Sequence, residues 1–226
     1  MKKLLVLLLT LAMILALAAC GGGKDPVSGG TSPVSGGETV PSAPQPTPAG
    51  PVGKWTLSES GDPAYAPGQI TMVLDETGSG YQAITQFKEN FSYMDFTELR
   101  WSEGAIFLEG KGGAFLLQGD TLTFTWDGMS SAYVRSGTAD TPLAPASGSY
   151  SSYVVYEEGE EYPDSSFSIT VNADGSGTWF SYGETHPMTW NRYFFTVDGD
   201  QSFYYLYDGS QLKIFDGEYL ILLKQS

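Results

Sequence analysis

Two stretches of the chain alternate large apolar side chains with other residues and then run into glycine-rich turns. This pattern constrains the fold more than any other feature. Residues 70–74 alternate in this way ahead of a turn at 77–80, and residues 167–171 do so ahead of a turn at 174–177. Because successive side chains of an extended strand point to opposite faces, each run can bury one face against a core. The pattern predicts half-buried β-strands.

Turn signals continue along the rest of the chain. Asp-Gly pairs occur at residues 127–128, 174–175, 198–199, 208–209 and 216–217. Glycine tolerates the positive φ that tight hairpin turns require, so Asp-Gly between apolar runs is a strong hairpin signal. After residue 52 no apolar stripe with helical spacing and caps occurs, and only residues 81–90 offer room for a turn or two of helix. The chain beyond residue 52 is therefore predicted to be all-β.

The alternating runs belong to two similar halves. Gly-Lys-Trp at residues 53–55 corresponds to Gly-Ser-Tyr at residues 148–150, and Trp101 corresponds to Trp190. Matching positions are offset by 97 residues at the glycine-rich turns and by 89 at the tryptophans, so the first half carries eight extra residues within 81–96. Landmarks that recur in the same order indicate an internal duplication.

Each half has room for roughly six to eight short strands, which must close on themselves to bury an apolar face and hide their edges. We predict an all-β fold with two tandem small antiparallel β-barrel or meander domains, following a signal helix and a disordered linker. One pseudo-symmetric barrel built from both halves is the alternative. The predicted segments are a signal peptide, a linker that begins with a lipidated cysteine, β domain 1, a second linker and β domain 2, at residues 1–19, 20–51, 52–136, 137–146 and 147–226.

Three features of the halves resemble a known kind of repeat: the opening Gly-x-Trp/Tyr, the glycine-rich turn after the second strand, and the closing antiparallel run. Together they are similar to the small lipocalin-like repeats of bacterial lipoproteins. The resemblance covers residues 52–225. It implies small antiparallel barrels, often in tandem.

The first twenty residues have the parts of an export signal. A positively charged start precedes an apolar stretch at residues 4–17, which is shorter than the roughly 20 residues needed to span a bilayer. The stretch ends in Leu17, Ala18, Ala19 and Cys20. This ending resembles the lipobox of bacterial lipoproteins, which implies cleavage before Cys20 and a lipid on its thiol. The protein is then expected on the extracytoplasmic face of the cell membrane, lipid-anchored.

Composition excludes several classes of function. The chain has one Cys and one His, which rules out an internal disulfide and a Cys/His zinc site. Its net charge of −15 speaks against binding nucleic acid, because few cations are available to neutralise phosphates. The Gly-, Ser-, Thr- and Pro-rich residues 21–51 contain no aromatic side chain, which predicts a spacer rather than a domain. No cofactor is predicted.

Aromatic and acidic residues supply the candidate binding positions of the second half. Rings on both faces of residues 203–207 imply a second buried surface, contributed by the other half, a ligand or a partner. Candidate ligand-binding residues are Trp179, Tyr182, Trp190, Tyr205 and Tyr207. The acidic residues Glu157, Glu158, Glu160, Glu161 and Asp164 are a candidate calcium site, or else a charged hairpin tip that favours solubility.

The sequence contains few of the side-chain combinations that catalysis requires. The single imidazole, His186, has no nucleophile-elbow serine motif to accompany it and is interpreted as a solvated turn residue. We therefore predict a non-enzymatic binding or interaction module whose target is a hydrophobic ligand, a glycan or a protein. A carboxylate-based glycan hydrolase of the cell envelope is the alternative. A cavity lined by Trp and Tyr would favour ligand binding, whereas filled barrels with one flat apolar patch would favour a protein partner.

The lipid anchor makes a direct prediction. Replacing Cys20 with Ser removes the only thiol in the chain, and with it the acyl chains that would hold the protein in the bilayer. The variant is expected in the soluble fraction after membranes are separated by centrifugation. Continued retention of the Cys20→Ser protein in the membrane fraction would contradict the anchor.

Overall fold

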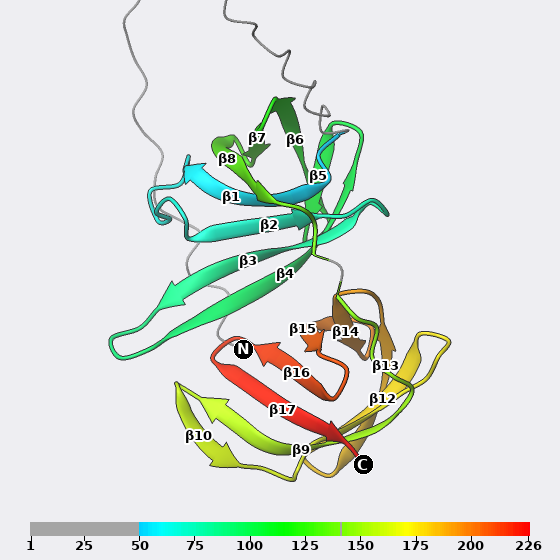
Figure 1. The fold of residues 1–226 in the computed structure, drawn as a ribbon. Coiled ribbons are helices and arrows are strands. Elements are labelled where there is room, and N and C mark those ends of the chain that lie inside the picture. The colour runs from blue at the N-terminus through cyan, green and yellow to red at the C-terminus, as the bar shows by residue number, and fades with distance from the viewer. Residues whose placement is uncertain (1–49, 141) are drawn as a thin grey trace, which may run out of the picture. The chain divides into compact units, whose positions relative to one another are not determined.

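The computed structural model describes residues 50–140 and 142–226, which belong to one compact unit (Figure 1). The predicted signal peptide and lipobox, with nearly all of the predicted spacer, lie outside the described residues. The described chain consists of strands joined by turns and irregular segments. Within these residues no helix is long and apolar enough to cross a membrane.

The first eight strands form a closed antiparallel barrel in simple meander order, here called barrel 1. The strands are β1 (Gly53–Glu59), β2 (Ile70–Leu74), β3 (Ser79–Phe87), β4 (Ser92–Ser102), β5 (Ala105–Leu108), β6 (Lys111–Gln118), β7 (Thr121–Trp126) and β8 (Met129–Gly137). Pairing of β1 with β8 closes the ring, with Thr56 opposite Val134. Every strand of barrel 1 therefore has a neighbour on both sides.

The remaining strands form a second closed antiparallel barrel, barrel 2. They are β9 (Gly148–Glu157), β10 (Glu160–Pro163), β11 (Ser168–Val171), β12 (Ser176–Ser181), β13 (Glu184–Trp190), β14 (Phe194–Val197), β15 (Gln201–Tyr207), β16 (Gln211–Asp216) and β17 (Tyr219–Gln225). β17 pairs with β9 to close the ring, while β10 forms a short hairpin with the end of β9. The predicted all-β fold with two tandem barrels is confirmed, and the single shared barrel is wrong.

Each barrel encloses its own core. Ile70, Met72 and Leu74 face the interior of barrel 1, on the face that their alternation predicted. Phe167 and Ile169 occupy the same place in barrel 2. Trp55 and Tyr150, the aromatic residues of the opening motifs, are each 0% exposed.

The two barrels are closed at the same end by equivalent contacts of different aromatic side chains. Trp55 Nε1 donates to the carbonyl oxygen of Pro51 at 2.8 Å, and Tyr150 Oη donates to that of Ala146 at 2.7 Å. In barrel 1 the Arg135 guanidinium also lies 4.2 Å from the centre of the Trp55 ring. In each barrel a buried ring thus reaches back four residues to a backbone carbonyl and fills one end.

One glycine after the turn is required for the same steric reason in both barrels. A β-carbon at Gly80 would collide with the carbonyl oxygen of Val73 on the neighbouring strand, and one at Gly177 would collide with that of Thr170. Only glycine allows the two backbones to approach this closely. The matching glycines are therefore required by the strand pairing itself.

The eight extra residues of the first half lengthen one hairpin. β3 and β4 contain 9 and 11 residues, whereas the equivalent β12 and β13 contain 6 and 7. The possibility of helix at residues 81–90 is wrong, because β3 pairs continuously with β4 from Ser79 to Phe87. Beyond β3, Lys88 Nζ makes an ion pair with Glu218 Oε1 of barrel 2 at 2.9 Å.

Outer faces of the two barrels pack against each other. Val73, Tyr81 and Ala83 of barrel 1 share a buried cluster with Tyr193, Phe194 and Tyr204 of barrel 2. The rings of Phe96 and Tyr204 are stacked with centroids 3.9 Å apart. This contact explains why residues 203–207 carry rings on both faces, since Tyr205 faces the core of barrel 2 and Tyr204 faces barrel 1. The second buried surface is supplied by the other half.

A buried carboxylate lies in this contact. Asp75, in the turn between β2 and β3, is 1% exposed and accepts hydrogen bonds from the backbone and hydroxyl of Thr77 and the backbone of Ser79. Arg192 and the Tyr193 hydroxyl, both from barrel 2, donate to its second oxygen at 3.0 and 3.1 Å. Burial alone raises the pKa of Asp75, but the hydrogen bonds from Thr77, Ser79 and Tyr193 outweigh it and hold the pKa below its ordinary value.

The Asp75→Asn substitution tests this contact between the barrels. Asn172 occupies the equivalent turn of barrel 2, so asparagine is compatible with the turn. The variant is expected to lose about 2 kcal/mol of unfolding free energy at pH 7, because Arg192 and Tyr193 lose a charged acceptor. A lowered native pKa adds stability above the unfolded value of 3.8 and loses it as the pH falls through the native pKa. The deficit measured by urea unfolding should therefore shrink below about pH 4.

The matched control is Asp120→Asn. Asp120 also pairs with an arginine, Arg135, at 3.1 Å, but its side chain is 66% exposed. A solvent-exposed pair contributes at most about 1 kcal/mol. Equal losses in the two variants, or a deficit for Asp75→Asn that does not change with pH, would contradict the assignment.

Candidate functional site

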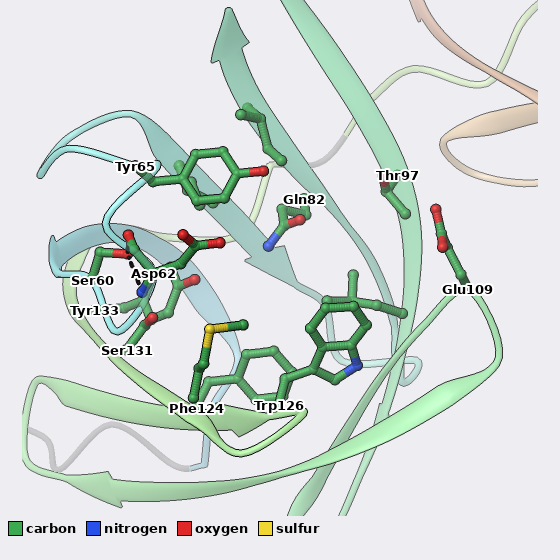
Figure 2. Close-up of a pocket in the computed structure, with 14 residues that line it drawn as sticks. Ser60, Asp62, Tyr65, Gln82, Thr97, Glu109, Phe124, Trp126, Ser131 and Tyr133 are labelled. Carbon is green, nitrogen blue, oxygen red and sulfur yellow. Dashed lines mark hydrogen bonds between the residues drawn. The ribbon is translucent and has the colours of Figure 1, made fainter. Parts of the chain in front are cut away.

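Barrel 1 is filled at one end and hollow at the other. A cavity of about 270 Å³ opens above its core, and Figure 2 shows residues that line it. Ile70, Phe124 and Tyr133 are core residues that form its floor. Tyr65, from the connection between β1 and β2, and Trp126, at the end of β7, add aromatic walls. We call this opening the mouth of barrel 1.

Polar groups surround these rings. Asp62 accepts a hydrogen bond from the Ala64 backbone at 2.9 Å, and its own backbone N–H is bound by the Ser60 hydroxyl. Gln82 and Glu109 also line the cavity (Figure 2). The mouth thus combines an apolar floor with a few hydrogen-bonding groups, which is the usual composition of a small-molecule site.

Barrel 2 opens into a larger cavity of about 500 Å³, which we call the mouth of barrel 2. Its floor is aromatic. Trp179 stacks on Phe203 with ring centroids 4.6 Å apart, and Phe167 contacts Trp179 edge-on at 4.4 Å. Ile221 completes the apolar surface. The rings pack against the core and hold one another in place.

Three tyrosines surround that floor. Tyr162, Tyr182 and Tyr219 are 45%, 99% and 41% exposed, so each presents a ring to solvent at the edge of the cavity. Tyr219 Oη donates to Glu157 at 2.8 Å, and this hydrogen bond raises the pKa of Tyr219. The Tyr219 hydroxyl therefore stays protonated at neutral pH and fixes the position of the Glu157 carboxylate.

Tyr182 has the left-handed backbone found at four other X-Gly turns of the described chain, and it is the aromatic residue among them. Tyr182 and Gly183 form the turn between β12 and β13 with φ of +52° and +84°. Glycine and asparagine adopt this left-handed conformation at little cost, whereas a bulky side chain is strained in it. The turn therefore holds a large ring in a costly conformation and leaves it in solvent.

Both mouths lie at the equivalent end of their barrels. The cavity-lining pairs Ile70 and Phe167, Gln82 and Trp179, and Ile84 and Ser181 are offset by 97 residues. Across the other wall the pairs are Trp126 and Asp216, Met129 and Tyr219, and Ser131 and Ile221, each offset by 90 residues. The duplicated fold thus places an opening in the same position twice, with different side chains.

The structure brings only some of the predicted ligand-binding residues together. Trp179 and Tyr182 line the mouth of barrel 2. Trp190 Nε1 instead donates to the Asn172 carbonyl at 3.0 Å, as Trp101 Nε1 does to the Asp75 carbonyl in barrel 1.

Two more of the predicted residues lie away from the cavity. Tyr205 is fully buried and donates to the Asn191 carbonyl at 2.6 Å. The Tyr207 hydroxyl is bound to the Gly209 carbonyl. These tyrosines serve packing and turn formation.

The acidic residues are divided between the mouth and the β9–β10 turn. Glu157 and Asp164 line the cavity. Glu160 and Glu161 accept hydrogen bonds from the hydroxyls of Tyr162 and Tyr156, respectively. Glu158 lies in the turn itself, with φ of +51°. Within residues 50–140 and 142–226, no three His, Cys, Asp or Glu side chains are grouped to hold a metal ion.

His186 lies in a strand, which corrects its interpretation as a turn residue. It lies in β13 opposite Trp179, and its side chain is 31% exposed. Nδ1 is 2.8 Å from Asp198, and Nε2 is 3.8 Å from Glu184. In the described part of the chain no serine or threonine hydroxyl is bonded to the imidazole. The pair lacks the nucleophile that a hydrolytic triad requires.

Sequence reasoning missed the whole mouth of barrel 1 and part of that of barrel 2. Tyr162 and Tyr219 were not singled out, nor were Tyr65 and Trp126, whereas Phe203 was noted only as part of the aromatic run 203–207. The duplication could have located the mouth of barrel 1. Gln82 lies 97 residues before Trp179, so it is the equivalent of a predicted ligand-binding residue, and it lines that mouth.

No protein-family model and no curated protein sequence matches the chain. Among solved structures, a protein of unknown function from the DUF3598 family of Nostoc punctiforme PCC 73102 is 13% identical, with a TM-score of 0.22. The match covers 78% of this chain and 96% of that one. The H. pylori beta clamp in complex with 5-chloroisatin is 8% identical, with a TM-score of 0.21, and the match covers 76% and 55% of the two chains.

Calcium provides a test of the acidic residues. Their carboxylates are divided between separate hydrogen bonds, and calcium requires six to eight converging oxygens. Millimolar calcium is therefore expected to leave the melting temperature of the fragment 50–226 nearly unchanged in a thermal unfolding experiment. Magnesium at the same concentration controls for ionic strength. A rise of many degrees with calcium alone would identify a site.

Proposed function

We propose that the protein is a lipid-anchored extracytoplasmic binding module, without enzymatic activity, that holds a small ligand with an apolar body in a barrel mouth. The observation that carries the proposal is the aromatic cavity above a filled core, which recurs at the equivalent end of both barrels. We further propose that the two barrels are lipocalin-like repeats of a bacterial lipoprotein, attached to the membrane through Cys20. The opening motifs at residues 53–55 and 148–150 and the lipobox support this part.

The size of the mouths supports ligand binding. Small-molecule sites usually measure about 300–1,000 Å³ and are lined mainly by apolar and aromatic groups with a few polar ones. At about 500 Å³ the mouth of barrel 2 lies within that range, and the mouth of barrel 1, at about 270 Å³, lies just below it. The mouth of barrel 2 is therefore the principal site in this proposal.

The strained Tyr182 supports the same choice. An ordinary turn would carry asparagine or aspartate before Gly183, so a fully exposed tyrosine there costs stability without contributing to packing. Strained residues of this kind concentrate where a side chain is needed for binding. In the proposal the Tyr182 ring covers part of the bound ligand.

Plugging variants test whether the mouths bind ligands. The uncharged fluorophore N-phenyl-1-naphthylamine is expected to bind the fragment 50–226 saturably, with a blue-shifted and enhanced emission. In the double variant Gln82→Trp with Ser181→Trp, each new indole fills a mouth, and saturable binding should be lost. Circular dichroism checks that the variant is folded.

The matched control introduces two tryptophans at positions on the outer faces of the barrels. Ser58→Trp with Ser202→Trp substitutes two exposed strand positions and is expected to bind the dye like the parent protein. Equal binding by the plugged and control proteins, or no saturable binding by the parent, would contradict the proposed function.

A further inference from the structure

We propose that the mouth of barrel 2 binds an organic cation, with its ammonium group among the rim tyrosines and carboxylates and its apolar body on the aromatic floor. This inference rests on the proposed ligand-binding function and specifies the class of ligand. The cavity and its rings accommodate the apolar body, and the charge of the lining determines the sign of the ligand's charge.

The lining of this cavity carries charge of one sign. Glu157, Asp164 and Asp216 contribute carboxylates, and the described residues that line the cavity include no lysine, arginine or histidine. Barrel 1 has Trp126 where barrel 2 has Asp216, and Met129 where barrel 2 has Tyr219. The larger mouth is thus more acidic and more tyrosine-rich at these positions of the shared fold.

Hydrogen bonds favour the anionic form of Asp164 and fix the position of Glu157. Burial by itself raises the pKa of Asp164, but hydrogen bonds from Ser152 and Ser166 outweigh it and lower that pKa. Glu157 is held at the edge of the cavity by the hydrogen bond that it accepts from the Tyr219 hydroxyl at 2.8 Å. At neutral pH the cavity therefore repels an anionic ligand and attracts a cation.

The tyrosine rings strengthen the preference for a cation. An aromatic face carries partial negative charge and binds ammonium groups, most strongly where water is excluded. Tyr162, Tyr182 and Tyr219 are the exposed rings of this rim. Elsewhere in barrel 2 the chain makes such a contact itself, with Lys224 Nζ 4.0 Å from the centre of the Tyr153 ring.

Rings and carboxylates select the same kind of ligand. A neutral apolar molecule would use the floor formed by Phe167, Trp179 and Phe203 but would gain nothing from the negative charge of the lining. A sugar would use the hydrogen-bond acceptors without using their charge. Only a cation with an apolar body is attracted by the floor, the rings and the net negative charge together.

Shape-matched probes isolate the effect of charge. Phenyltrimethylammonium, tert-butylbenzene and benzenesulfonate have similar shapes and are cationic, neutral and anionic, respectively. Each is titrated against the fragment 50–226, with displacement of N-phenyl-1-naphthylamine and calorimetry as readouts. The cation is expected to bind about tenfold more tightly than the neutral isostere, and the anion more weakly than both. Raising the salt concentration should reduce the advantage of the cation.

Three variants assign the effect to this mouth. Glu157→Gln and Tyr182→Asn are each expected to weaken binding of the cation severalfold while leaving tert-butylbenzene nearly unaffected. Tyr182→Asn should also raise the melting temperature, because it removes the strained turn residue. Asp208→Asn, a turn carboxylate away from the cavity, should change neither affinity.

The outcomes separate this inference from the function on which it rests. Equal affinities for the cation and its neutral isostere, or tighter binding of benzenesulfonate, would overturn the cation preference and leave the proposed binding function intact. Stronger displacement by a neutral disaccharide such as cellobiose would identify a sugar site and also overturn the preference. Failure of the dye and of all three probes to bind the parent protein would overturn both.

Discussion

Closure of each sheet into a ring is the constraint on which the rest of the structure depends. Pairing of β1 with β8 and of β9 with β17 removes the exposed edges that a meander of short strands would otherwise present. Closure also creates an interior whose volume must be filled. Trp55 and Tyr150 fill one end of that interior and are anchored to backbone carbonyls four residues earlier. The opposite end receives less side-chain volume and remains open as a mouth.

Closure leaves the outer faces to make the remaining contacts. Barrel 1 and barrel 2 pack ring against ring through Phe96 and Tyr204. The duplicated turns differ at the position that matters for this contact, because Asp75 meets Arg192 of the other barrel whereas Asn172 bonds within its own turn. A carboxylate this deeply buried needs several donors, and barrel 2 supplies two of them. The turn that contains Asp75 thus connects the two barrels, whereas the turn that contains Asn172 makes its hydrogen bond locally.

Local patterns in the sequence predicted much of the fold and little of the mouths. Alternation at residues 70–74 identified the inward face, and the offset of the halves located the lengthened hairpin. Residues 81–90 were ambiguous because polar Thr85 and Gln86 interrupt the alternation, and pairing with β4 decides their conformation. The mouths could not be predicted in the same way, because Tyr162, Trp179 and Tyr219 come from separate strands. Only the register of the closed ring brings them together.

The two halves have similar side chains at some equivalent positions and different side chains at others. Positions that build the barrel have equivalent roles, such as Gly80 and Gly177 at the crowded strand crossing. Positions around the openings differ in kind, with Gln82 facing one cavity and Trp179 the other. The Asp75 turn also differs between the halves, and there the change serves the contact between the barrels. The differences around the openings have no such packing role, and they support the proposal that the mouths bind a ligand.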